Sequence, residues 1–276
     1  MKSIEISGEM SGLTVREILK KSGVSRRLTT RLKAAPDGIC IDGRRVKVSE
    51  RAFEGSTIIL NEPDSADIMA NPELMGRVGV LYEDSEVIVF DKPADMPVHQ
   101  SVKHREDTLA NFFACLYPGR TFRPVNRLDR DTAGCVAAAK SSYAADFLQR
   151  ELKKSYFGLI PPTPLSGGRI SAPIARERES IILRCVREDG RYAVTNWVVR
   201  QRREDCCLCE FILETGRTHQ IRVHMAHIGL PLIGDSMYGG DRSQRDSQAL
   251  VCGELRFISP EHGREVRVRS GYLERL

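Results

Sequence analysis

The chain has 276 residues, a hydrophobic fraction of 41% and a formal net charge of +5. This length suits one large domain plus a small one, and the apolar content is ordinary for a soluble globular protein. No run reaches the roughly 18 apolar residues of a membrane-spanning helix, and the N-terminus lacks the apolar core of a secretory signal, so we expect a cytoplasmic protein without a membrane partner.

The first part of the chain is basic and helical. Residues 1–60 hold 12 Lys and Arg against 7 Asp and Glu, which accounts for the whole formal excess of +5. Apolar positions at helical spacing over 12–33, interrupted at Ser22–Gly23, predict two short helices. A basic stripe lies on their polar side, either as a solvated face or as a surface for phosphates. Its members are Lys20, Lys21, Arg26, Arg27, Arg31 and Lys33.

A hairpin and a closing strand complete this first unit. Alternating residues over 39–48 surround Asp42–Gly43, the strongest local hairpin signal, and Ile58–Leu60 predict one more strand. Residues 61–78 are polar and contain prolines, which predicts a linker. We therefore place domain boundaries at 1–60 and 79–276.

Beyond Val80 the pattern is mainly one of short strands with intervening helices. The clearest strands are 87–90, 136–139, 156–160 and 192–194. Helices are expected at about 107–117, 142–152 and 218–228, each starting near a Ser or Thr suited to N-capping. Strand-rich sequence with scattered helices predicts an α+β fold with a largely antiparallel sheet.

The eight cysteines are expected to be reduced thiols, because a chain of this size without a secretion signal has little use for disulfides. The cluster Cys206–Cys209 lacks a second cysteine pair at zinc-site spacing. Cys207, Cys209, Phe211 and Leu213 are every second residue and fall on one side of a predicted strand. Buried or half-buried small side chains are therefore favoured over a metal site.

The segment Arg123–Gly134 holds the most informative acidic residue, Asp129, between Arg127 and Arg130 in a strand, loop, strand pattern. Neighbouring positive charge favours the ionised carboxylate. Such a group suits a nucleophile or base that acts on a polyanionic substrate, whose phosphates the arginines would meet. The same spacing also fits a structural ion-pair network in a loop.

Further motifs occur at Asp91–His99, Lys154–Tyr156 and Glu214–His224, the last continuing to Gly239. Together with the segment around Asp129, they resemble the motifs of the RluA-type pseudouridine synthases, in the same order. The resemblance spans roughly residues 79–240, with a closing hairpin beyond. It implies a catalytic domain with a mixed, largely antiparallel sheet whose central cleft holds RNA.

The reaction implied by this resemblance is the isomerisation of uridine to pseudouridine within RNA. Nothing is added or lost, so no cofactor is expected. The target base must leave its stack, which costs a few kcal/mol and is easiest at loops. The order of helices, hairpin and basic surface in residues 1–60 resembles the small S-four-like RNA-binding domain that often precedes the catalytic domain in this family.

Residue roles follow from the same resemblance. Asp129 matches the carboxylate that either adds to the ribose or removes a sugar proton. Arg222 matches its arginine partner, and Tyr156 matches the tyrosine that packs on the flipped uracil. The remaining substrate contacts expected are the apolar wall Ile221, the arginine that enters the vacated space, Arg127, the phosphate contacts Arg130 and Arg217, and the flanking positions Lys154 and Asn126.

Two departures from the family pattern stand out. Asn126 replaces the usual histidine and cannot titrate, which excludes proton transfer at this position. Asp95 replaces a glycine; if the position requires positive φ, aspartate tolerates it better than most residues do. Both leave Asp129, Tyr156 and Arg222 in place.

The expected function is thus an RNA pseudouridine synthase that acts as a monomer on structured RNA, by default 23S ribosomal RNA, with transfer RNA as the alternative substrate. A second hypothesis is a non-catalytic RNA-binding or ribosome-assembly factor of the same fold. A metal hydrolase built on His219, His224 and His227 is disfavoured, because the glutamate of a His-Glu-x-x-His motif is missing. No metal site is expected.

Overall fold

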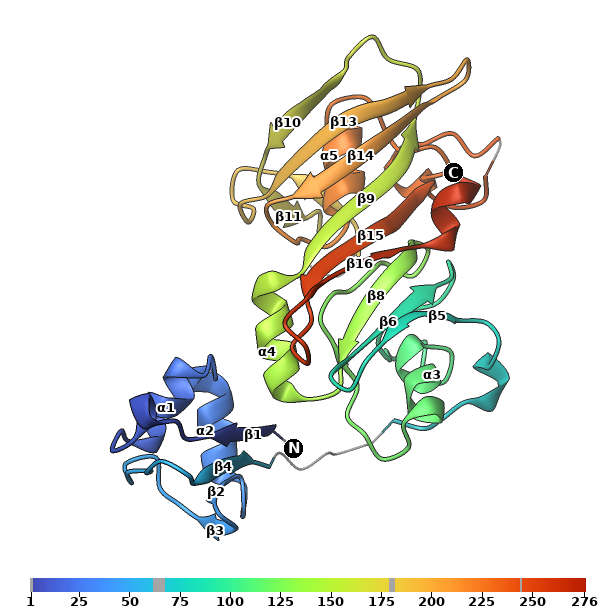
Figure 1. The fold of residues 1–276 in the computed structure, drawn as a ribbon. Coiled ribbons are helices and arrows are strands. Elements are labelled where there is room, and N and C mark those ends of the chain that lie inside the picture. The colour runs from blue at the N-terminus through green and yellow to red at the C-terminus, as the bar shows by residue number, and fades with distance from the viewer. Residues whose placement is uncertain (1, 62–67, 179–181, 244) are drawn as a thin grey trace.

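The computed structural model describes the chain in four stretches, residues 2–61, 68–178, 182–243 and 245–276. Figure 1 shows an N-terminal unit, residues 2–61, in blue beside a larger C-terminal unit that begins at residue 68. Each unit has a hydrophobic core of its own. Within the described stretches no helix has the length and apolar character needed to cross a membrane.

The N-terminal unit packs two helices on a sheet with strand order β1-β4-β2-β3. Its elements are β1 (Lys2–Glu5), α1 (Val15–Lys21), α2 (Arg26–Ala34), β2 (Ile39–Ile41), β3 (Arg44–Arg45) and β4 (Thr57–Leu60), after a 3-10 turn at Gly8–Met10. Thr14 and Glu17 form a capping box at α1, and Ser25 caps α2. Asp42 and Gly43 have φ of 46° and 81°, as a two-residue hairpin turn requires. The predicted helices, hairpin and closing strand are confirmed.

The C-terminal unit is built on one large sheet with strand order β10-β13-β14-β9-β15-β8-β6-β5, to which β16 and β7 add at β15 and β8. All described pairings in it are antiparallel except β15 with β8. The strands are β5 (Gly79–Glu83), β6 (Val87–Lys92), β7 (Arg123–Pro124), β8 (Ala133–Ala139), β9 (Lys153–Ile160), β10 (Gly167–Ser171), β13 (Val194–Arg202), β14 (Cys207–Leu213), β15 (Leu250–Ile258) and β16 (Glu265–Arg269), with β11 (Ile174–Arg176) and β12 (Arg184–Val186) paired separately. The predicted α+β class is confirmed.

Three helices accompany this sheet, α3 (Leu109–Leu116), α4 (Ser142–Glu151) and α5 (Gln220–His227), with 3-10 turns at Pro72–Leu74, Ser236–Tyr238 and Gly271–Arg275. Thr108 and Ser141 cap α3 and α4 as expected. The N-cap of α5 is His219, in the left-handed region, and it gives no side-chain cap. The strand expected at 192–194 is β13, which begins only at Val194. Its pairing with β14 starts at Thr195.

The side of β14 that carries Cys207, Cys209 and Phe211 is buried in the core, as the alternation predicts. Of the predicted linker, residues 62–67 lie outside the described stretches. Leu74 and Val78 are buried in the core of the C-terminal unit, so this part of the segment packs there and does not behave as a spacer.

The two units touch through α2 and α4, which lie side by side in Figure 1. The Ser25 hydroxyl donates to the Asp146 carboxylate, and Arg150 Nη2 donates to the Gly23 carbonyl at 3.0 Å. Tyr143 packs against the core of the N-terminal unit. Because α4 leads directly into β9, this contact ties the N-terminal unit to the strand that carries Tyr156.

Candidate active site

The loop between β7 and β8 presents Asp129, and its start is fixed by the Asn126 side chain. Asn126 Nδ2 donates to the Cys135 carbonyl at 3.0 Å, and its Oδ1 accepts from the Ala137 amide at 2.9 Å. The buried amide thus extends the pairing along β8. The position requires a side chain that donates and accepts at once, and the amide of Asn126 does both.

A buried lysine holds the other side of the loop. Lys92 Nζ donates to the carbonyls of Pro93 and Met96 at 2.7 Å and of Arg130 at 3.0 Å. Burial lowers the pKa of Lys92 to about 7, while nearby carboxylates oppose the shift. Asp95 has φ of 58°, so this position does have positive φ. Lys92 therefore joins the loop after β6 to the loop that carries Asp129.

Two adjoining cavities, of about 570 Å³ and 60 Å³, share Asp129, Arg127, Tyr156 and Arg217 in their walls. The structure brings all the predicted active-site residues to these cavities, although they come from three separate segments. The larger cavity also has Asn126, Arg130 and Lys154, and the smaller one also has Ile221 and Arg222.

Arg222 lies between two carboxylates and is bound much more closely to the one that the motif analysis did not single out. Its Nε and Nη2 each donate to Asp235 at 2.7 Å, whereas Nη1 is 3.5 Å from Asp129 Oδ2. The Asp235 side chain is 1% exposed and that of Arg222 is 6% exposed. This bidentate pair fixes the guanidinium plane, so the remaining nitrogen points at Asp129.

Tyr156 faces Asp129 from the central strand β9, where it pairs with Phe211 of β14 and Cys252 of β15. Its side chain is buried. Burial, with Cys252 and Asp129 nearby, raises the pKa of Tyr156 well above its ordinary value. The phenol therefore stays protonated and provides an apolar face with a neutral hydroxyl beside the carboxylate.

Of the three histidines considered as metal ligands, His224 is fully buried and uses both ring nitrogens. Nδ1 lies 2.9 Å from Thr195 Oγ1, and Nε2 lies 2.9 Å from the Ala172 carbonyl. His227 is exposed at the end of α5. His219 lines the small cavity with Nε2 3.9 Å from Asp129 Oδ2. Within the described residues, no group of three or more His, Cys, Asp or Glu side chains is arranged to hold a metal ion.

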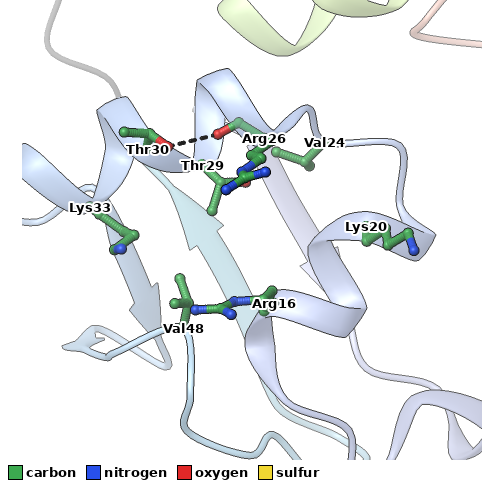
Figure 2. A pocket seen from close by; sticks show the side chains of 8 residues that line it. All are labelled: Arg16, Lys20, Val24, Arg26, Thr29, Thr30, Lys33 and Val48. Atoms are coloured by element: carbon green, nitrogen blue, oxygen red, sulfur yellow. Dashed lines mark hydrogen bonds between the residues drawn. The ribbon is translucent and has the colours of Figure 1, made fainter.

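A separate hollow of about 580 Å³ lies on the N-terminal unit and is basic (Figure 2). Lys20, Arg26 and Lys33 line it, together with Arg16, and a neighbouring hollow adds Arg45 and Lys47. Lys21 and Arg27 are exposed but do not line either hollow. Arg31 points elsewhere, since its Nη2 donates to Ser142 of α4 at 2.9 Å.

Arg16 could have been found from the sequence, because it lies one helical turn before Lys20 on the same face. Asp235 lies within the motif that continues to Gly239, but its pairing with Arg222 could not be found from the sequence, because an ion pair between a helix and the loop after it leaves no local pattern.

Comparison with known proteins matches this architecture to one family. A family model described as RNA pseudouridylate synthase matches residues 86–227. The uncharacterized RNA pseudouridine synthase YjbO of Bacillus subtilis is 36% identical over 261 residues, which cover 90% of this chain and 91% of that protein. Ribosomal large subunit pseudouridine synthase D of Xanthomonas campestris is 33% identical over 259 residues, covering 86% of this chain and 78% of its own length.

The solved structure of human RNA pseudouridylate synthase domain containing 1 shares the fold, with a TM-score of 0.58 at 24% identity, over 70% of this chain and 82% of that one. The matched segment contains Asp129, Tyr156 and Arg222 and, apart from Leu250, the residues that line the two cavities. The chain therefore belongs to the RNA pseudouridylate synthase family and is an isomerase that acts on RNA.

Proposed function

We propose that Asp129 is the catalytic carboxylate of this isomerase and that its substrate is a uridine in 23S ribosomal RNA. The observation that carries the proposal is the convergence of Asp129, Arg222 and Tyr156 on one cavity from separate segments. In the reaction the bond from ribose C1′ to uracil N1 breaks, a bond from C1′ to C5 forms, and the proton of C5 is replaced by one on N1. Atoms and charge balance without a cofactor.

Asp129 acts either by adding to C1′ or by removing the proton on C2′, and both routes require an ionised carboxylate with one oxygen free. Arg222 provides a positive charge beside the Asp129 carboxylate. Asp235 holds the guanidinium in this position. Tyr156 packs on the uracil, and its hydroxyl, kept neutral by burial, serves proton transfer at C5.

The target uridine enters the larger cavity only after it leaves its stack. Arg127 is exposed at the rim, where it would fill the space that the nucleotide vacates. Arg130, Arg217 and Lys154 would meet phosphates, and Ile221 and Leu213 supply apolar walls.

The basic hollow of the N-terminal unit, which we assign to an S-four-like domain of residues 1–60, would bind RNA phosphates away from the target base. Such contacts raise affinity without choosing the base. We expect Lys20→Ala with Lys33→Ala to raise KM several-fold and to reduce the salt dependence of binding, while kcat on saturating RNA is retained. Lys103→Ala with Arg105→Ala, outside both hollows, is the matched control.

The names of the relatives support large-subunit ribosomal RNA over transfer RNA, and we propose that the enzyme acts as a monomer in the cytoplasm. The test is pseudouridine mapping in cells that lack the gene, complemented with the native chain or with Asp129→Asn. Sites in 23S RNA that return with the native chain alone support the proposal. Sites that return only in transfer RNA contradict the substrate, and sites that return equally with Asp129→Asn contradict the catalytic role.

A further inference from the structure

The hydroxyl of Tyr238 has two partners of different kinds. The backbone amide of Arg184 lies 3.1 Å from it, and His219 Nδ1 lies 2.8 Å from it. A backbone N–H can only donate, so the phenol oxygen accepts there. The single proton of the hydroxyl is then available to Nδ1 of His219, and a hydrogen bond in this direction uses both the acceptor and the donor of the phenol.

This hydrogen bond decides which ring nitrogen of His219 carries a proton. Burial lowers the pKa of His219; Asp129 and Asp235 oppose this effect and Arg222 and Arg184 reinforce it, so the ring is neutral at pH 7. A neutral imidazole whose Nδ1 accepts a hydrogen bond carries its proton on Nε2. That nitrogen is the one that faces Asp129 Oδ2, at 3.9 Å.

The backbone also commits His219 to this orientation. The residue has φ of 58° at the N-cap of α5, and it is one of three non-glycine residues with positive φ among those described. Its ring meets Tyr238 edge to face, with centroids 5.7 Å apart. Strain of this kind persists only where the surrounding structure holds it, and it concentrates at functional sites.

Both donors on this side of Asp129 approach the same oxygen. Arg222 Nη1 is 3.5 Å from Oδ2, and His219 Nε2 approaches Oδ2 as well. We propose that His219 is a positioning residue whose Nε2–H closes on Oδ2 of Asp129 when a uridine fills the cavity, which leaves Oδ1 as the oxygen that reacts. Tyr238 fixes the tautomer that makes this possible. The inference rests on the proposed catalytic role of Asp129.

Three variants separate this role from a structural one. His219→Asn suits the left-handed backbone but is too short to place a donor at Nε2. His219→Gln places an amide nitrogen near that position. Tyr238→Phe keeps the ring over Arg222, whose guanidinium carbon is 5.0 Å from the ring centre, and removes only the hydroxyl. We expect kcat to fall about tenfold in His219→Asn and Tyr238→Phe with KM within about twofold, and His219→Gln to recover part of the loss.

The direct readout is the tautomer, measured by ¹⁵N NMR of imidazole-labelled protein in the absence of RNA. The native ring should be protonated at Nε2, and Tyr238→Phe should populate the Nδ1-protonated form. A native ring protonated at Nδ1, or unchanged kcat in His219→Asn, would overturn the proposal. Because the tautomer is read without turnover, it stands apart from the Asp129→Asn test: activity retained in that variant removes the catalytic role, whatever the tautomer.

Discussion

The pair of Arg222 with Asp235 offers the sharpest test of how the site is held. Asp235→Asn keeps the shape of the side chain but removes the charge and replaces one acceptor with a donor that faces a guanidinium. Removal of one partner from a buried ion pair costs about 3–5 kcal/mol. Both side chains are nearly inaccessible, and Asp129 at 3.5 Å compensates in part. We therefore expect a loss of about 3 kcal/mol in the free energy of unfolding.

Urea denaturation of the native chain, Asp235→Asn, Arg222→Met and the double variant measures this loss and the coupling between the two residues. The double variant should be less destabilised than the sum of the single variants by about 2 kcal/mol, since neither charge of the Arg222–Asp235 pair is left buried without the other. The exposed pair Arg187 with Asp189 serves as the matched control, and Asp189→Asn should leave the midpoint unchanged. Additive effects of the two buried substitutions would refute the reasoning.

Three further predictions concern Lys92, Tyr156 and the contact between the two units. Lys92→Met should lower the free energy of unfolding by about 3 kcal/mol in urea, because three carbonyls, of which that of Met96 is buried, lose their donor. Burial lowers the pKa of Lys92 to about 7, so above that pH the unfolded chain binds a proton on Lys92 that the folded chain has lost. The stability of the native chain relative to Lys92→Met should therefore rise between about pH 7 and 10. A difference that does not change with pH would contradict this. The raised pKa of Tyr156 means that the folded chain keeps a proton that the unfolded chain loses above about pH 10, so stability should fall there in the native chain and less in Tyr156→Phe, measured by circular dichroism. A double-mutant cycle of Ser25→Ala and Asp146→Ala should show a coupling of about 0.5–1 kcal/mol in urea unfolding, and zero coupling would contradict docking of α2 on α4.

Local signals in the sequence predicted the elements that local chemistry controls. The two N-terminal helices follow from spacing and from the caps at Thr14 and Ser25, and the hairpin follows from Asp42–Gly43. The cavity residues were found because four motifs lie in a familiar order, and the sheet then brings them together.

Tertiary contacts decide the features that the sequence left open. Asp235 meets Arg222 only because the loop after α5 folds back over the helix. The Arg31 side chain does not line the basic hollow, because it donates to Ser142 of the C-terminal unit. His219 takes positive φ where a capping Thr or Ser was expected, and no residue near it in sequence signals this.

The most direct test of the account compares purified native chain, Asp129→Asn and Asp131→Asn for release of tritium from RNA labelled at C5 of uridine. Asp131 is two residues away and pairs with Arg130 at 2.9 Å, but its own side chain lines neither cavity. The Asp131→Asn variant therefore controls for changes in the loop. We predict release by the native chain and by Asp131→Asn, and none by Asp129→Asn while it still binds RNA. Release by Asp129→Asn at the native rate would contradict the central claim that this carboxylate performs the reaction.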